Sequence, residues 1–196
     1  RQLQLRRNHS SSMPNSIDIY TPIYGQYLPE LPLFINTEEQ QRYFALNLQD
    51  QIFLNDQWSV LFGARFDHIT QDFQNKLAGT SSKKDLQQTS PRLGLNYRLN
   101  DRWSWYVNYG ESFALNSGMD RNGDVFNPEK GKSYEIGGKY RINPQSLLSL
   151  ALFKRDKENV LTTDPADSNY QITAGEVSSK GLELDLETQL NDQFSI

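Results

Sequence analysis

The sequence contains no cysteine and no long apolar run. Without cysteine the chain can have neither a disulfide framework nor a thiolate zinc site. Its most apolar stretch, Leu147 to Phe153, is interrupted by Ser149 and falls far short of the roughly 18 residues that a transmembrane helix needs. No charged start leads into an apolar segment and a cleavage site, so a signal peptide is not expected either. The sequence thus predicts a mature or internal segment that does not cross a membrane as helices.

Basic charge and average hydrophobicity are also low. Twenty Lys and Arg stand against 24 Asp and Glu, for a net charge of −4, and the basic residues are scattered among acids. Without a basic patch, no nucleic-acid partner is expected. Hydrophobic residues make up 36% of the chain and the mean hydropathy is −0.71, values that by themselves indicate a poorly buried chain.

Aromatic residues, by contrast, are plentiful. Ten Phe, ten Tyr and three Trp amount to 12% of the chain, and disordered segments lack such side chains. A sequence that is polar on average yet rich in aromatics is typical of a membrane β-barrel, because every second residue of each strand faces a water-filled lumen.

A short turn phrase recurs along the chain. Asn and Asp suit tight reversals, and strand-like sequence flanks each copy, so we expect hairpin turns. The copies are Leu54-Asn55-Asp56-Gln57-Trp58, Leu99-Asn100-Asp101-Arg102-Trp103 and Leu190-Asn191-Asp192-Gln193-Phe194, with a variant at Ile142-Asn143-Pro144-Gln145.

The flanking segments alternate with a period of two, which indicates strands with one apolar face. In the clearest case, residues 181–187, every second residue is Leu. The expected strands are 1–6, 41–54, 58–71, 89–99, 103–113, 131–142, 146–157 and 171–190, with another opening at Phe194. Residues expected to face lipid are Phe62, Val107 and Leu184, and those expected to face the lumen are Arg65, Asn108 and Asp185.

Longer polar segments separate the hairpins, at about 72–88, 114–128 and 163–170, and residues 8–40, with four prolines, are expected to form one large extracellular loop. A soluble β-sandwich has similar strands, but the alternation of short turns with long loops favours a barrel. A propeller would need four strands in each repeat, where only two long ones fit.

Six phrases follow one another along the strands. They are Leu48-Gln49-Asp50-Gln51, Gly63-Ala64-Arg65-Phe66-Asp67, Ser90-Pro91-Arg92, Tyr109-Gly110-Glu111-Ser112-Phe113, Pro128-Glu129-Lys130-Gly131-Lys132-Ser133-Tyr134-Glu135-Ile136-Gly137 and Gly181-Leu182-Glu183-Leu184. In this order they resemble the TonB-dependent siderophore receptors, most nearly those for ferrichrome and other hydroxamates. One departure is that Ala114-Leu115-Asn116 follows Ser112-Phe113 where such receptors often carry Pro, so the loop there is expected to leave the barrel differently.

The resemblance implies an all-β, antiparallel transmembrane barrel, with residues 1–196 supplying about eight strands of a 22-strand type. It implies a Gram-negative outer-membrane receptor that imports a ferric siderophore, with outer-membrane lipid around it and TonB engaged through a plug domain outside this sequence. A passive porin or an adhesin-like structural barrel shares the strand pattern and stays an alternative, because fold does not decide function.

No phrase predicts catalysis, a cofactor or a protein-held metal. Asp120-Arg121-Asn122-Gly123-Asp124 looks like the start of a calcium loop, but Gly131 stands where the twelfth-position acid is required, so a polar turn is expected. The two histidines, His9 and His68, have no partner at a ligand spacing. An outer-membrane enzyme is therefore a third and weaker alternative.

Tyrosines in the long loop are the candidate ligand contacts. Tyr20, Tyr24 and Tyr27, with Phe34 nearby, have no strand face to fill, and Tyr170 borders a shorter loop. They can pack the loop on itself. Alternatively, as the resemblance implies, they grip the outer shell of a siderophore whose iron is already coordinated.

Overall fold

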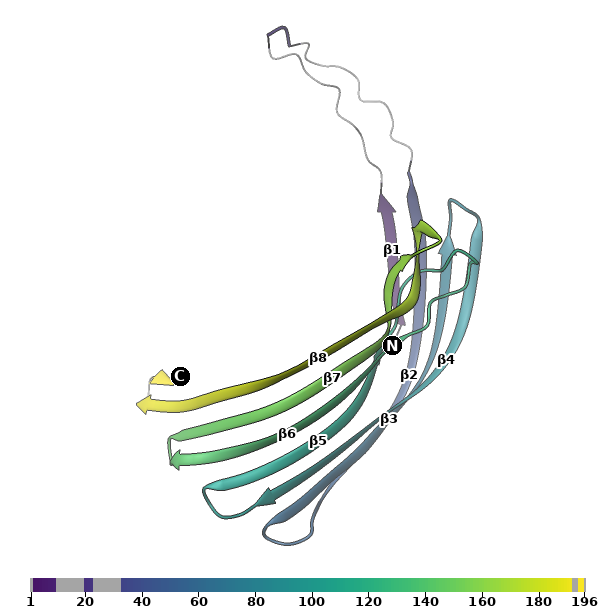
Figure 1. Cartoon of the computed structure of the whole chain (residues 1–196). Helices are drawn as coiled ribbons and strands as arrows, with labels where there is room; N and C mark the ends of the chain where they lie inside the picture. Colours follow the sequence, from purple (N-terminus) through teal and green to yellow (C-terminus); the bar gives the residue numbers. More distant parts are fainter. Residues whose placement is uncertain (1, 10–19, 23–32, 192–193, 196) are drawn as a thin grey trace.

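The computed structural model describes residues 2–9, 20–22, 33–191 and 194–195. Nine antiparallel strands follow one another through the sheet in chain order, and Figure 1 shows them curved into an open arc. None of the described residues forms a helix of the length and hydropathy that crossing a membrane requires. The strands are β1 (Gln2–His9), β2 (Ile35–Phe53), β3 (Trp58–Asn75), β4 (Thr80–Arg98), β5 (Trp103–Ala114), β6 (Glu129–Asn143), β7 (Ser146–Asp164), β8 (Asp167–Asn191) and β9 (Phe194–Ser195).

One face of the sheet carries continuous rows of apolar side chains, as the alternating sequence predicts. Phe62, Val107 and Leu184 lie on this apolar face and are 42%, 48% and 67% exposed, which confirms their predicted direction. So wide an exposed apolar band matches the lipid-facing surface of a membrane barrel. One row crosses seven strands through the pairs that join Ile52, Val60, Leu95, Val107, Ile136, Leu152 and Leu182.

The opposite, polar face carries the residues predicted for the lumen. Arg65, Asn108 and Asp185 each stand an odd number of residues from an apolar-face residue of the same strand, so they point the other way. The register agrees, because Asn108 pairs with Gly94 on one side and Glu135 on the other. The antiparallel barrel segment that the sequence predicted is therefore confirmed.

The short turns are held by their asparagines. Asn55 Oδ1 accepts hydrogen bonds of 2.9 Å from the N–H groups of Gln57 and Trp58. Asn100 does the same for the N–H groups of Arg102 and Trp103. The third copy of the phrase, 190–194, includes residues 192–193, which lie outside the described residues. We call the side of the sheet with these turns the turn end and the opposite side the loop end.

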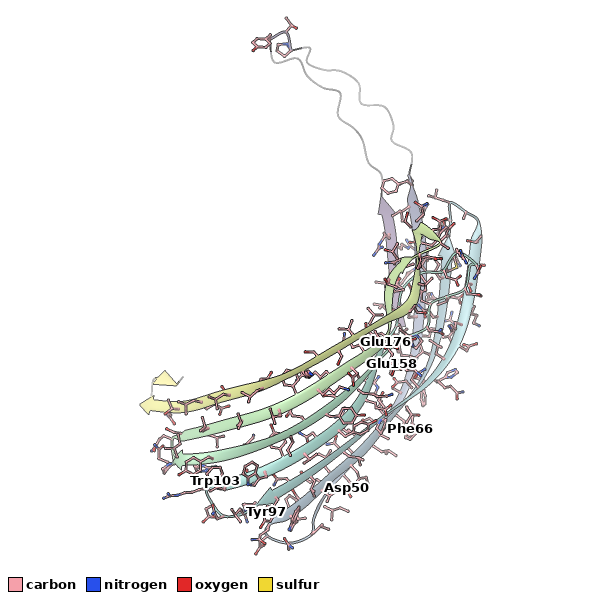
Figure 2. The ribbon with its side chains drawn as sticks, viewed as in Figure 1. Asp50, Phe66, Tyr97, Trp103, Glu158 and Glu176 are labelled. Carbon is pink, nitrogen blue, oxygen red and sulfur yellow. The ribbon has the colours of Figure 1, made fainter. Side chains whose placement is uncertain are left out.

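Aromatic rings line the apolar face at the turn end. Trp58 packs on Tyr97 with ring centroids 4.4 Å apart, and Trp103 packs on Tyr140 at 4.3 Å. Figure 2 labels Tyr97 and Trp103 at this edge of the sheet. Since Trp103 is 38% exposed, it lies in no closed core, and its place beside a short turn suits the interfacial aromatic girdle of a membrane barrel.

Three predicted connections at the loop end are shorter than the sequence indicated. The segment predicted as a loop over 72–88 is strand except for a turn at 76–79, and 163–170 reduces to a turn at 165–166. Within 8–40, residues 8–9 belong to β1 and 35–40 to β2. The prediction was wrong because these strand ends are rich in polar residues and carry only isolated apolar ones, such as Phe73, so period-two apolar alternation is missing although the backbone ladder continues.

Among the connections that the structure describes throughout, the one from β5 to β6, residues 115–128, is the longest, and it is close to the predicted 114–128. Beside it the sheet divides: β4 pairs with β5 only from Arg92 to Arg98, whereas β4 pairs with β3 over nearly its full length. Residues 80–91 therefore have a ladder partner on one side only. We call residues 115–128 the β5–β6 loop, and Figure 1 shows it reaching from β5 and β6 toward the upper part of β4.

Candidate ligand-binding site

The β5–β6 loop is organised by its own polar turn. Met119 and Val125 form a β-bridge, and the Asp120 N–H donates to the Asp124 carbonyl at 2.9 Å. The Asp120 carboxylate accepts from the N–H groups of Asn122 and Asp124, both at 2.9 Å. The motif that looked like a calcium loop is thus a turn, as predicted, whose first acid binds backbone. Among the described residues no group of three His, Asp or Glu side chains is placed to hold a metal ion.

Buried polar groups fasten the loop to β2 and β3. Glu39 is only 2% exposed, and its carboxylate accepts hydrogen bonds from Gln41, from Gln71 at 2.7 Å and from the hydroxyl of Ser117 in the loop. Gln71 Nε2 also donates to the carbonyl of Asn116 at 2.9 Å. Because a buried carboxylate without donors is costly, this network holds the start of the loop firmly on the polar face.

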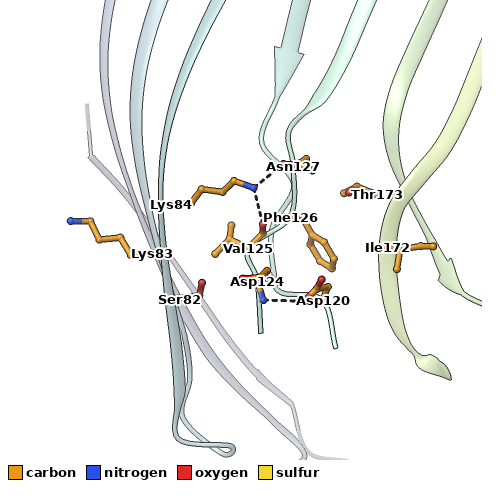
Figure 3. A pocket seen from close by; sticks show the side chains of 10 residues that line it. All are labelled: Ser82, Lys83, Lys84, Asp120, Asp124, Val125, Phe126, Asn127, Ile172 and Thr173. Carbon is orange, nitrogen blue, oxygen red and sulfur yellow. Dashed lines mark hydrogen bonds between the residues drawn. The ribbon is translucent and has the colours of Figure 1, made fainter. Parts of the chain in front are cut away.

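A lysine and a small apolar core fasten the middle of the loop to β3 and β4. Lys84 Nζ donates to the carbonyl of Val125 at 3.1 Å and to Asn127 Oδ1 at 2.8 Å, as Figure 3 shows. Val125 and Phe126 are 4% and 6% exposed. On the polar face of the strands, three more apolar side chains are buried, namely Ile69, Phe73 and Leu86. The loop therefore brings apolar cover to a face that is otherwise polar.

The tip of the β7–β8 hairpin holds the other side of the loop. Asn116 Nδ2 donates to the backbone carbonyl of Asn159 at 2.9 Å, and Asn159 Nδ2 donates to the carbonyl of Pro128 at 3.0 Å. Arg121 Nε lies 3.6 Å from the carboxylate of Asp164, whose side chain is 6% exposed. The loop thus ties β2–β4 to β7 and β8 across the division in the sheet.

A cavity of about 550 Å³ opens where these elements meet at the loop end. Its size is within the range of small-molecule sites, and its wall combines aromatic rings with positive charge and exposed backbone groups. Such a wall can bind a compact ligand with a polar shell. The aromatic lining residues are Phe34, Phe73, Phe126 and Tyr170, and the basic ones are Arg7 and Arg121.

A second cavity, of about 420 Å³, lies on the other side of the β5–β6 loop and is drawn in Figure 3. It runs between Lys84 of β4 and Ile172 and Thr173 of β8. Lys84 already bonds to the loop, and the Asp120 carboxylate is used by backbone N–H groups. Its polar groups therefore serve the fold, and the aromatic cavity is the better candidate site.

The predicted tyrosines are placed differently from one another. Tyr170 lines the aromatic cavity, whereas Tyr20 is 88% exposed and is not one of its lining residues. Tyr24 and Tyr27 lie outside the described residues. A contact of any of the four with ligand stays a prediction.

Sequence reasoning missed Phe73 and Phe126. Phe73 stands on the polar face of its strand, where an aromatic breaks the alternation, and Phe126 follows Val125 in an otherwise polar loop. These two exceptions to the pattern were the available signals. From these signals one could infer that the two side chains are buried, but not that they line the same cavity.

Comparison with known proteins agrees with this architecture. The family model described as "TonB dependent receptor-like, beta-barrel" matches residues 2–196. The chain is 38% identical over 197 residues to the metal-pseudopaline receptor CntO of Pseudomonas aeruginosa (strain UCBPP-PA14), covering 97% of this chain and 28% of that protein. It is 33% identical over 162 residues to the ferrichrome outer membrane transporter/phage receptor of Escherichia coli K12, covering 79% and 22%.

A solved structure shows the same fold. The ferric-catecholate import receptor Fiu from K12 E. coli superimposes with a TM-score of 0.70 at 20% identity, over 97% of this chain and 31% of that one. The chain thus spans less than a third of the length of each of these proteins. The family match, the meander of long strands and the exposed apolar band lead to one conclusion: the chain belongs to the TonB-dependent receptor β-barrel family of the Gram-negative outer membrane.

Proposed function

We propose that the chain is a wall section of a receptor that imports a ferric siderophore in a TonB-dependent manner, and that the aromatic cavity contacts the ligand. The observation that carries the proposal is the convergence of four aromatic side chains and two arginines at the loop end of a barrel of this family. Iron in a siderophore is already coordinated by the chelator, so the protein has to grip an organic shell. Aromatic faces give large contact area, and Tyr170 adds a hydroxyl.

The names of the relatives support a metal complex as the ligand class. One is a metal-pseudopaline receptor and another a ferrichrome transporter. Arg7 and Arg121 suit a ligand whose shell presents carboxylate, hydroxamate or other oxygen acceptors. TonB is proposed to act through a plug domain encoded outside this sequence.

A passive porin is less well supported. It would need a lumen lined by solvated polar groups, whereas here a buried loop and an aromatic cavity occupy the polar face at the loop end. Family membership points the same way, because the matched model describes receptors. The family points to a receptor and transporter in place of an enzyme, because the matched model and the named relatives are receptors and transporters.

The test is uptake of radioactive iron by cells that express the full-length receptor, with and without TonB. A panel of ferrichrome, the iron complex of pseudopaline, and ferric catecholate and carboxylate complexes serves as probes. We expect at least one complex to be taken up only when TonB is present. Uptake that persists without TonB, or no uptake from any complex, would contradict the proposal.

The cavity is tested by equilibrium binding of the imported complex to the purified receptor. We expect Tyr170→Ala to weaken binding by about 1–3 kcal/mol, the loss typical of a central aromatic contact. Tyr140→Ala is the matched control, because Tyr140 packs on Trp103 at the turn end, on the apolar face. Equal affinity of the Tyr170 variant and the parent would remove the cavity from the proposal and leave the import function standing.

A further inference from the structure

Asn159 in β7 has an unusual backbone conformation. It is the one residue other than glycine with a positive φ in the described part of the chain, at 60°. The left-handed region is unfavourable for most side chains, and asparagine is among the few residues that tolerate it. A strand residue held there needs surroundings that fix it.

The register shows why the conformation occurs. Lys157 pairs with Val177 and the next pair is Val160 with Gly175, so two residues of β7, Glu158 and Asn159, oppose Glu176 alone. This is a β-bulge, which bends a strand and increases its twist. Figure 2 labels Glu158 and Glu176 at the place where β7 and β8 turn upward.

The facing strand is adapted to the bend. A side chain at Gly175 would place its Cβ 2.8 Å from the carbonyl oxygen of Val160, closer than real contacts allow. The next pair after Val160–Gly175 is Leu161–Thr173, so Ala174 is an extra residue on β8. Two opposed bulges thus form a hinge within the hairpin.

Asn159 also connects the hinge to the β5–β6 loop in two ways. Its side-chain amide donates to the carbonyl of Pro128 at 3.0 Å, and its own carbonyl accepts from Asn116 Nδ2 at 2.9 Å. The loop is in turn fixed to β2 and β3 through Ser117 and Glu39. The bend is therefore braced, through the loop, against β2 and β3.

Beyond the hinge, the hairpin tip carries Tyr170 to the cavity. The pairing passes from Thr163–Gln171 to Asp164–Asp167, which leaves residues 168–170 without a residue opposite. Tyr170 therefore gets its position from the direction of the hairpin and not from a ladder partner of its own. It lines the cavity together with Phe34 and Phe126, which belong to distant parts of the chain.

We propose that Asn159 is a positioning residue: it sets the angle of the β7–β8 tip and so keeps Tyr170 at the aromatic cavity. Its left-handed backbone makes the bend, and its amide locks the bend to Pro128. The effect of Asn159 on ligand binding rests on the proposed function, whereas its effect on the position of Tyr170 does not.

The position is measured by electron paramagnetic resonance distances in the full-length receptor. Spin labels replace Tyr170 and Leu77, which both line the cavity from different hairpins, and any cysteine elsewhere is changed to serine. Asn159→Gly keeps the backbone conformation and loses the amide; Asn159→Ala loses both. We expect the distance distribution to broaden and shift in both variants, more in Asn159→Ala. Asn143→Ala, at the end of β6 beside the turn that leads into β7, is the control and should leave it unchanged.

Ligand affinity separates the two proposals. The probe is ferrichrome, or whichever ferric complex of the panel above is imported. We expect Asn159→Ala to weaken binding about tenfold in the parent and to add nothing in a Tyr170→Ala background, because the asparagine acts through the tyrosine. Unchanged distances in both variants would overturn the positioning role. Altered distances with unchanged affinity would uphold it and count against the cavity as the ligand site.

Discussion

The two ends of β3 carry most of their large apolar side chains on opposite faces. Toward the turn end, Trp58, Phe62 and Phe66 lie on the apolar face, and only Leu61 lies on the polar one. Toward the loop end, Ile69 and Phe73 lie on the polar face, where they are 0% and 8% exposed. The pairing with β2 and β4 runs through this change without a bulge. The alternating direction of the side chains therefore stays the same along β3, and only the surroundings of its two faces change.

The comparison teaches that the direction of burial is set by what covers the sheet. In the half of the sheet toward the turn end, the apolar face is of the kind that meets lipid in membrane barrels, and the alternation follows from that arrangement. In the half toward the loop end, the β5–β6 loop covers the polar face of β3 and β4. The outer surface there is charged, with Lys76 Nζ 2.5 Å from Glu38 and Arg6 Nε 3.6 Å from the same carboxylate.

Removal of the loop's apolar cover should give the largest effect. We expect Phe126→Ala to destabilise the docked loop by about 3–5 kcal/mol, the usual cost of a buried Phe with the cavity it leaves. The measurement is hydrogen exchange of the β5–β6 loop amides in the full-length receptor. Phe44→Ala is the control: Phe44 is 72% exposed on the apolar face, so its loss should hardly change that exchange. Equal effects of the two variants would break the comparison.

A charge placed on the apolar face of β3 toward the turn end tests the same comparison at the other end of the strand. We expect Phe62→Arg to cost about 2–4 kcal/mol near the middle of the membrane, because the guanidinium would face hydrocarbon. Asn108→Arg, on the polar face, should cost much less. Reversible unfolding of the full-length receptor from lipid vesicles measures both. If the two variants proved equally stable, the assignment of the faces to lipid and lumen would be wrong.

A fall in pH should have the smallest effect on stability, at the charged surface around Glu38 near the loop end. Hydrogen bonds from Lys76 and Gln4 lower the pKa of Glu38 below its usual value of 4.5. The folded-state pKa is thus below the unfolded one, so the stabilisation is complete above about pH 4.5 and is lost as pH falls through the folded pKa. Exposed pairs contribute little. Hydrogen exchange of the 76–79 turn should rise slightly in acid, and Glu38→Gln should abolish that pH dependence; an unaltered pH response in this variant would assign it to other groups.

The strands were predicted well from the sequence in the half of the sheet toward the turn end, and poorly in the half toward the loop end. A strand between lipid and the lumen has an apolar residue at every second position, and the Asn-Asp phrases mark the turns, so the strands and the direction of their side chains could be predicted there. From Phe66 to the loop end, both faces of the strands meet water or the β5–β6 loop. Stretches such as Lys83-Lys84-Asp85 therefore resemble a loop sequence, although they continue the backbone ladder. Their backbone pairing and their contacts with the β5–β6 loop leave no apolar period of two in the sequence.

The candidate site was predictable only in part. Tyr170 stood out because it borders a polar segment, and it does reach the cavity. Phe73, Phe126 and Arg121 come together through the docking of the β5–β6 loop, which depends on Glu39 and Asn159 far away in the chain. Such long-range contacts carry no local pattern. The hinge at Asn159 was equally invisible, because nothing in the residue type announces a bulge.

The asparagine-closed turns bear on how such a sheet is assembled. Asn55 and Asn100 bind backbone N–H groups two and three residues ahead, so each reversal is closed by its own few residues before any neighbouring strand arrives. Isolated hairpins form in about 1–10 μs, much faster than a large sheet closes. A slip of one residue would turn every lipid-facing side chain toward water. Because the turn fixes the register early, it determines which face of each newly formed hairpin is apolar and can enter the bilayer.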